Sequence, residues 1–364
     1  MPRLDIKLIN NRKNFSAIQV QWTKLLEKSD AHSLFCSWEW LYNWWEMYAK
    51  TQDKLCILTL TEENELKAIA PFYIKQTKYT SELRFIGTGE TEESEVCSEC
   101  QDILCKKGYQ SDVGNSIKQW LIQNQNLWDI IQFSLLHKSS ITYQNLLTRF
   151  SNHEHPASWW YQLPLNQLKD NSDASIYLSS IERKRDKLFR SNHVEIVKIK
   201  TENELESAFE DLIQLHQNRW QEQNCLGAFS SEQFINVHKR VSKDFLILGN
   251  LAFYLLKVDG ISKAALYNFR IGKTEYFYQS GFDQQFKKRL SLGAQLHLYA
   301  INDAIKHKLH VYDFMAGEQN SYKTLYGCET EQLVNITIFG KSLRGRLLLI
   351  FEYIKSTIKR FRHK

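Results

Sequence analysis

The chain has 364 residues, of which 43% are apolar and 13% aromatic, so it is too long for one average core and apolar enough to build two. Its net charge of +6 is unevenly placed, because residues 341–364 carry eight Lys/Arg and one acid while the rest has 39 cations and 40 anions. A neutral body of this kind argues against a general DNA-binding or tRNA-binding surface, which needs a spread basic face.

The N-terminal residues, MPRLDIKLINNRKNF, carry charges where a signal peptide needs an apolar run, and no stretch reaches the ~18–20 apolar residues of a membrane span. We therefore expect a cytoplasmic protein whose seven cysteines are reduced thiols. Cys97, Cys100 and Cys105 form a C-x2-C-x4-C cluster, but no second pair and no nearby His supplies a fourth ligand. No metal is expected.

In the first half, apolar periodicity predicts two helices, near residues 15–28 and 38–48. Strands follow at 55–61 and 66–74, joined by the turn Glu62-Glu63-Asn64, and a third strand lies at 82–87. After a long acidic loop come a helix near 113–125 and a strand at 128–136. This half therefore has the order α-α-β-β-β-α-β.

The second half repeats that order. Helices near 202–221 and 232–242 precede strands at 251–258, 262–271 and 274–282, then a helix near 293–308 and a strand at 310–315. Two copies of one α/β unit with a mixed sheet explain this order most simply. We expect domains at 1–165 and 166–340, followed at 341–364 by a basic helix with an apolar stripe.

The stretch FKKRLSLGAQ, Phe286–Gln295, joins the third strand of the second copy to its helix. A helix N-terminus is an anion site; Gly293 lets the backbone come close, Ser291 can cap or donate, and Lys288 and Arg289 add charged donors. In the first copy the corresponding segment carries six acids between residues 90 and 102, so it would repel phosphate. The second copy is thus the expected anion site, although a solvated loop has the same composition.

The run GFDQQFKKRLSLGAQLHLYAINDAIKHKLHVYDFMAGEQNSYKTLYG, Gly281–Gly327, resembles the C-terminal half of CelD/BcsL-like acetyltransferases of the GNAT superfamily, which are related to FemAB-type tandem GNAT proteins. The segments LHQNRWQEQNCLGAF and VDGISKAALYNF fit the same family. The resemblance implies two tandem GNAT-like domains, of which the second binds acetyl-CoA or another acyl-CoA. Arg289 and Ala294 fit the ends of the family's (Gln/Arg)-x-x-Gly-x-(Gly/Ala) loop, but Leu292 stands where its first Gly belongs.

Acyl transfer to an amine needs a base for the ammonium and a proton for the departing thiolate. Asp313, near the C-terminal end of its strand, is our first candidate for the base, with Glu318 as the alternative; Asp313 would otherwise cap the following turn. Tyr322 and Tyr326 are the candidates for the acid, and Lys323 is expected to bind CoA phosphate or the acceptor. Each is otherwise an ordinary packing or surface residue, which is the preferred interpretation of Tyr326. The resemblance places backbone N–H donors for the oxyanion near residues 279–282.

His216, Arg219 and Trp220 lie one helical turn apart, and the resemblance implies that this helix borders the acceptor site. The expected activity is acyl-CoA-dependent N-acylation of an amine, such as an amino sugar or an exopolysaccharide or other cell-envelope precursor. The alternatives are an aminoacyl-tRNA-dependent FemAB-type peptidyltransferase and a non-catalytic, membrane-docked scaffold of an exopolysaccharide synthesis complex. Residues 344–364 are expected either to contact an anionic inner membrane or to pack on the body.

Overall fold

The computed structural model describes residues 4–31, 33–148, 150–168, 171–222, 224–286 and 288–362, with Lys288 and residues 355–362 described by their backbone alone. The chain divides into two compact units. Unit 1 comprises Met1–Gly89, Cys97–Ala157 and Gln332–Lys364, and unit 2 comprises Glu90–Val96 and Ser158–Glu331. The domain limits expected at residues 165 and 340 stay a prediction.

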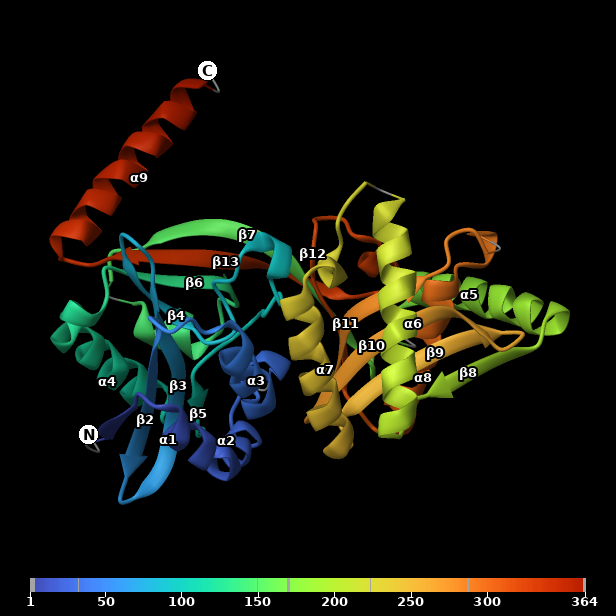
Figure 1. Cartoon of the computed structure of the whole chain (residues 1–364), viewed down its shortest axis with the longest axis horizontal. Coiled ribbons are helices and arrows are strands. Elements are labelled where there is room, and N and C mark those ends of the chain that lie inside the picture. The colour runs from blue at the N-terminus through green and yellow to red at the C-terminus, as the bar shows by residue number, and fades with distance from the viewer. Residues whose placement is uncertain are drawn as a thin grey trace. The chain divides into compact units, whose positions relative to one another are not determined.

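Unit 1 is a mixed sheet with helices (Figure 1). Its strands run in the order β1, β2, β3, β4, β6, β13, with β5 beside β3. These strands are β1 (Asp5–Ile9), β2 (Lys54–Glu62), β3 (Glu65–Gln76), β4 (Ser81–Phe85), β5 (Leu104–Cys105), β6 (Ile130–Leu136) and the end of β13 (Glu329–Phe339). The helices are α1 (Arg12–Ala17), α2 (Gln19–Leu26), α3 (Trp38–Tyr48), α4 (Gln110–Gln123) and α9 (Leu343–Arg362).

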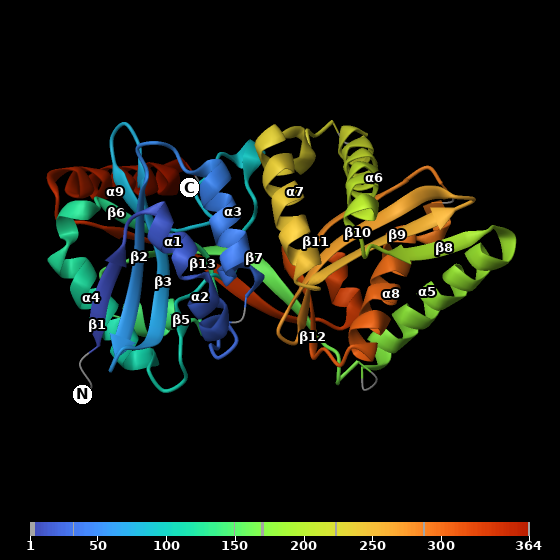
Figure 2. The ribbon, with the colours of Figure 1, turned by 60° about the horizontal axis from the view of Figure 1, so that its bottom comes forward.

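Unit 2 repeats this plan around its own core (Figure 2). Its strands run in the order β7, β12, β11, β10, β9, β8. They are β7 (His153–Pro164), β8 (Val194–Lys198), β9 (Leu251–Val258), β10 (Ile261–Ile271), β11 (Thr274–Phe282) and β12 (Val311–Gly317). Helices α5 (Ser172–Ser191) and α8 (Leu292–Lys306) cover one face, and α6 (Glu202–Gln221) and α7 (Glu232–Ile247) cover the other.

Each unit is completed by a strand from the other half of the chain. In unit 1, β4 runs parallel to β6, and β6 takes β13 as its antiparallel neighbour. In unit 2, β11 runs parallel to β12, and β12 takes β7. The predicted α/β class with a duplicated mixed-sheet unit is confirmed, but the sequence reading missed α5 and the strands β1, β5, β7, β8 and β13.

The strands β11 and β12 form a fork. They pair only over Thr274–Tyr276 and Val311–Asp313, after which no ladder joins them among the described residues. A bulge follows at once, because the β10–β11 register skips Tyr278. Beyond the bulge, Gly281 lets α6 approach closely, since a Cβ there would lie 2.6 Å from the backbone N of His216. The fork thus opens beneath α6.

The helix α6 owes its position to a clear local pattern. Thr201 and Glu204 form a capping box at its start, and Leu205, Leu212 and Leu215 lie on its buried face. A side chain such as Arg219, one turn beyond Leu215, is therefore carried to the mouth of the fork.

The described helices include none that is both long and apolar enough to cross a membrane.

Candidate functional site

A cavity of about 320 Å³ lies at the fork, and we call it the fork cavity. Its wall combines the end of β11, the first turns of α8, one residue each of α5 and α6, and two tyrosines of the 3-10 helix η7 (Tyr322–Tyr326). The lining residues are Tyr177, Arg219, Ser280, Phe282, Asp283, Gln284, Phe286, Ser291, Leu292, Gly293, Ala294, His297, Tyr322 and Tyr326. The predicted loop-to-helix junction therefore borders a real cavity.

The N-terminus of α8 forms one end of this wall. Ser291, its N-cap, has left-handed dihedrals (φ 54°, ψ 60°), and its hydroxyl makes no capping bond. The hydroxyl instead accepts a hydrogen bond from Lys184 Nζ at 3.2 Å. A Cβ on Gly293 would lie 3.4 Å from the Phe282 ring, which is an ordinary contact. The fold therefore does not require glycine at this position, although glycine leaves more space there. Unpaired helix N–H groups and one lysine thus face the same space.

The cations expected at this end lie in different places or outside the described side chains. Arg289 is exposed and does not line the cavity, and the side chain of Lys288 lies outside the described residues. Lys323 is only 7% exposed, and its Nζ donates to the carbonyls of Met315 (3.1 Å) and Ala316 (2.7 Å). Lys323 is therefore used in holding the end of β12. Lys184 of α5 is the cation that contacts the N-cap residue Ser291 among the described side chains.

Two cavity residues, Tyr177 and His297, were missed from sequence, as was Lys184, which contacts the cavity residue Ser291. Tyr177 and Lys184 belong to α5, whose buried positions Leu178, Ile181 and Leu188 keep helical spacing and were the available signal. His297 lies four residues after Gly293, on the same face of α8. That spacing alone would have placed His297 inside the cavity.

Asp313 is buried and fully hydrogen-bonded. Its oxygens accept from Trp160 Nε1 (3.1 and 3.0 Å), Gln162 Nε2 (3.1 Å) and the backbone N of Met315 (2.7 Å). Burial raises the pKa of Asp313 to about 6, although these donors pull it down. Neither Asp313 nor the exposed Glu318 lines the fork cavity, so the structure does not bring either expected base to it.

The raised pKa of Asp313 predicts a pH-dependent stability. The unfolded carboxyl ionises near pH 4 and the folded one near 6, so the unfolded chain releases its proton first and stability falls as pH rises between them. Compared with Asp313→Asn, which cannot ionise, the natural chain should lose about 3 kcal/mol over that window. Urea unfolding of both proteins at intervals from pH 4 to 7 measures this. A pH-independent difference would contradict the assignment.

The three residues expected on α6 have separate positions. His216 is buried; its Nδ1 contacts Gln217 Oε1 (3.1 Å) and its Nε2 accepts from Trp220 Nε1 (2.9 Å), so both ring nitrogens are used. Burial lowers the pKa of His216 to about 4. Arg219 alone lines the fork cavity, with its guanidinium 4.8 Å from the Phe282 ring and no ion pair among the described residues.

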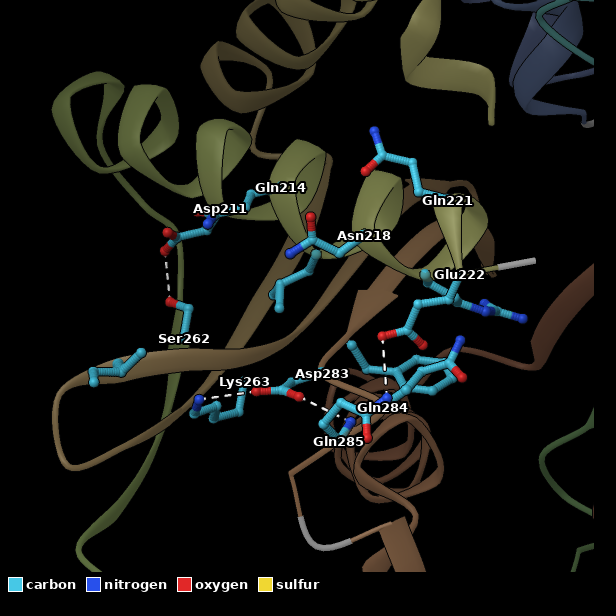
Figure 3. A pocket seen from close by; sticks show the side chains of 14 residues that line it. Asp211, Gln214, Asn218, Gln221, Glu222, Ser262, Lys263, Asp283, Gln284 and Gln285 are labelled. Carbon is cyan, nitrogen blue, oxygen red and sulfur yellow. Dashed lines mark hydrogen bonds and ion pairs between the residues drawn. The ribbon is translucent and has the colours of Figure 1, made fainter. Parts of the chain in front are cut away.

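A second cavity, of about 610 Å³, lies between α6 and the ends of β10 and β11, and we call it the α6 cavity (Figure 3). Its polar groups are prearranged: Ser262 donates to Asp211 (2.5 Å), and Asp283 pairs with Lys263 (2.9 Å). The lining residues are Asp211, Gln214, Leu215, Asn218, Arg219, Gln221, Glu222, Ile261, Ser262, Lys263, Phe282, Asp283, Gln284 and Gln285. Both cavities share Arg219, Phe282, Asp283 and Gln284, so they adjoin.

Within the described part of the chain, no group of three or more His, Cys, Asp or Glu side chains is placed to hold a metal ion. Cys97 is exposed, Cys100 half-buried and Cys105 buried in β5.

Comparison with known proteins identifies the domain that carries both cavities. Residues 177–324 match the family Acetyltransf_6, described as an acetyltransferase (GNAT) domain. This span contains every lining residue of the α6 cavity and all of those of the fork cavity except Tyr326. No curated protein matches the sequence. The expected GNAT-type acyltransferase is thus confirmed at the level of the domain family.

Solved structures share the fold over nearly the whole chain. FemX covers 92% of this chain and 98% of its own, with a TM-score of 0.61 at 11% identity. The C-terminal domain of a putative lysylphosphatidylglycerol synthetase from Agrobacterium fabrum covers 92% and 95% (TM-score 0.55, 10% identity). L-PGS from Bacillus licheniformis covers 93% and 96% (TM-score 0.54, 11% identity). At such identities these likenesses show the fold alone.

Proposed function

We propose that this protein is an acyl-CoA-dependent N-acyltransferase that binds the acyl donor in the fork cavity and the amine acceptor in the α6 cavity. The observation that carries the proposal is the N-terminus of α8, with Lys184 beside it, on a cavity that opens where β11 and β12 part. The family match spans the same elements. Acetyl-CoA and longer acyl-CoA are the donors to test.

The pyrophosphate of the donor would lie against the first turn of α8. Leu292, Gly293 and Ala294 supply backbone N–H groups there, Ser291 supplies a hydroxyl, and Lys184 adds a charge. A charge-assisted hydrogen bond contributes about 1.5–3 kcal/mol where it is partly desolvated. The thiol end of the donor would then run inward, toward the fork.

The transfer itself forms one bond and breaks one. The neutral amine attacks the thioester carbon, the C–N bond forms, and the C–S bond breaks with its electron pair going to sulfur. Counted from the ammonium form, the acceptor nitrogen gives up two protons, one before the attack and one after the C–N bond forms. The thiolate takes up one, so one proton is released. Tyr322 lines the fork cavity and is the proposed donor of the thiolate's proton. The acceptor's first proton leaves through the solvent-open α6 cavity; Asp313 and Glu318 do not line either cavity.

The α6 cavity suits a polar, hydroxyl-rich amine. Its wall offers the amides of Gln214, Asn218, Gln221 and Gln284, groups that both donate to and accept from hydroxyls. The carboxylates of Asp211 and Glu222 attract an ammonium group. Arg219, which has no acidic partner among the described residues, is free to bind an anionic group of the acceptor. An amino sugar or another cell-envelope or exopolysaccharide precursor has this chemistry.

Calorimetric titration with acetyl-CoA and with a longer acyl-CoA tests the donor. The natural chain should bind at least one of them, and Lys184→Glu should weaken binding at least about tenfold by replacing an attraction with a repulsion. Lys187→Glu makes the same charge change one turn further along α5, at an exposed residue that, unlike Lys184, has no hydrogen bond to Ser291 among the described residues, and should leave affinity within about twofold. If the two variants bound acyl-CoA with equal affinity, the proposed donor site would be wrong.

The alternatives make different predictions in the same experiment. An aminoacyl-tRNA-dependent transferase would ignore acyl-CoA and bind tRNA with a steep dependence on salt. A non-catalytic scaffold would show no turnover with any amine, whether or not acyl-CoA binds. Binding of acyl-CoA with release of CoA in the presence of an amino sugar favours the proposal over both.

The helix α9 is proposed to rest on an anionic membrane surface. Of its described apolar side chains, Leu347, Ile350, Phe351 and Ile354 are 52–64% exposed, and the helix is rich in Lys and Arg. Co-sedimentation with vesicles containing phosphatidylglycerol should be lost in the variant Ile350→Glu/Phe351→Glu and should be weak with neutral vesicles. If the variant sediments as the natural chain does, α9 is not the contact.

A further inference from the structure

The inner end of the fork cavity is formed by an imidazole. Where β11 and β12 part, Phe277 and Phe314 are the first residues without a partner across the fork. The ring of His297 lies 4.6 Å from the Phe277 ring and 5.1 Å from the Phe314 ring, measured between centroids. His297 is 4% exposed and lines the fork cavity. The His297 ring therefore lies where β11 and β12 separate, at the start of the cavity.

The hydrogen bonds around His297 fix which of its nitrogens carries the hydrogen. Asn268 Nδ2 donates to the Tyr312 hydroxyl oxygen at 3.1 Å, and His297 Nδ1, at 2.9 Å, is the one acceptor for the Tyr312 hydrogen among the described residues. Nδ1 is then an acceptor, so the neutral ring has its hydrogen on Nε2. Burial lowers the pKa of His297 to about 3, which keeps the ring neutral at physiological pH.

This arrangement is anchored in the core. Asn268 cannot turn its amide round, because its Nδ2 also donates to the carboxylate of Glu275 at 2.8 Å, where an amide oxygen would be repelled. Glu275 is in turn held by Arg270 Nη2 at 2.7 Å. Asn268, Glu275 and Tyr312 are all 0% exposed. The chain of bonds gives His297 one tautomer and one orientation.

A second polar group belongs to the same wall. The hydroxyl of Tyr326 is fully buried and makes no hydrogen bond of 3.5 Å or less among the described residues, although an orphaned buried hydroxyl costs about 1–3 kcal/mol. Its side chain interacts with that of Tyr177, which lines the same cavity. The rings of Tyr326 and His297 lie 5.8 Å apart, and both residues line the fork cavity. His297 Nε2 has no protein partner in the described chain. His297 and Tyr326 therefore each offer a neutral donor group on the wall of one cavity.

We infer that His297 Nε2–H and the Tyr326 hydroxyl form a donor pair for the carbonyl oxygen of the acyl thioester, with Tyr312 as the positioning residue that sets the histidine tautomer. A phosphate group would instead call for charged donors, which lie at the α8 N-terminus, and an ammonium group would call for acceptors. An oxygen that gains negative charge during acyl transfer fits two fixed donors in a dry site. The inference rests on the proposed function, because it needs the donor in the fork cavity.

The test compares two ligands that differ at one oxygen. Acetyl-CoA has the carbonyl, and S-ethyl-CoA, a thioether of equal length, lacks it. The natural chain should bind acetyl-CoA about tenfold more tightly than S-ethyl-CoA. In His297→Phe this ratio should fall to about one to two, while affinity for S-ethyl-CoA changes little. His297→Gln, whose amide can still donate, should restore part of the ratio.

Two further variants separate positioning from packing. Tyr312→Phe keeps the ring but frees Nδ1, so the ratio should fall about threefold without a matching loss of S-ethyl-CoA affinity. Tyr299→Phe removes a hydroxyl from α8 outside the cavity and should leave the ratio unchanged. If His297→Phe does not fold, Tyr326→Phe, which loses only a hydroxyl, provides the same comparison.

The outcomes distinguish this inference from the proposed function. Failure of the natural chain to bind any CoA derivative overturns both. Binding of the two ligands with equal affinity, an unchanged ratio in folded His297→Phe and Tyr326→Phe, or an equal loss of both ligands overturns the donor pair and leaves the transferase standing.

Discussion

Replacing Arg270 with Met is expected to lower the free energy of unfolding by about 3–5 kcal/mol, because it leaves the buried Glu275 without a cation among the described residues. Asp303 keeps Lys198, whose Nζ lies 2.9 Å from Asp303 Oδ2. Arg270 Nη2 lies 2.7 Å from Glu275 Oε2 and 2.7 Å from Asp303 Oδ2. Glu275 is completely buried, and burial already raises its pKa, which Arg270 counteracts. Without the guanidinium, Glu275 must either stay charged in the core or take up a proton.

Urea unfolding at pH 7 measures the effect, with Lys243→Met as the matched control. Lys243 pairs with Glu202 at 2.8 Å, but both side chains are more than half exposed, so that variant should lose much less stability than Arg270→Met. Adding Glu275→Gln to Arg270→Met removes one unpaired charge and should recover part of the loss. A loss no larger than that of Lys243→Met would show that the buried network does not support the core.

The Arg270 network also connects stability with the cavity. The same Glu275 that pairs with Arg270 orients Asn268, and Asn268 orients Tyr312 against His297. Residues on β10, β11 and β12 are thus joined by polar bonds directly beneath the fork. Polar groups so deep in a core are stabilising only when all of them are paired. Here the side-chain amide oxygen of Asn268, Oδ1, has no hydrogen-bond partner among the described residues. This pattern is more easily understood as support for His297 than as core packing alone.

Local patterns predicted the elements that form the fork. The apolar periodicity predicted the first and last residues of α6, β9 and β11 correctly, because each element has a clear apolar face and a clear end signal. Thr201 and Glu204 mark the start of α6, the turn at Asp259-Gly260 marks the end of β9, and the bend after Phe282 marks the end of β11. The residues Phe286–Gln295 themselves predicted the α8 junction, and the family resemblance agreed with it. These features depend on residues close together in the chain.

The parts that were missed depend on distant pairing. The strand β7 contains Trp160 and Gln162, which bind Asp313 more than 150 residues away, and only half of its residues are apolar. Nothing near Asp313 in the sequence indicates that its oxygens are already taken. Likewise, the loop cations Lys288 and Arg289 suggested a phosphate site by proximity, whereas Lys184 reaches Ser291 from 107 residues earlier in the chain. The charges of a loop can be counted from its sequence, but tertiary packing decides which residues line a cavity.

Gly293→Asp is expected to separate folding from binding at the α8 N-terminus. Gly293 occupies the second position of the helix, where an acidic side chain interacts favourably with the helix dipole by about 0.3–1 kcal/mol. A Cβ there meets only the Phe282 ring, at 3.4 Å, so the substitution fits. The thermal unfolding temperature should therefore stay the same or rise.

The same carboxylate would lie where the donor's pyrophosphate is proposed to bind. Two unit charges about 5 Å apart repel by about 3 kcal/mol at an effective dielectric constant near 20, so affinity for acetyl-CoA should fall at least about 100-fold. Gly293→Ala is the matched control: it adds the same Cβ without charge and should cost less than about tenfold in affinity. Calorimetry with acetyl-CoA and with CoA should give parallel losses, because both carry the pyrophosphate. If the stable Asp variant bound acetyl-CoA as well as the Ala variant does, the helix N-terminus would not be the phosphate site.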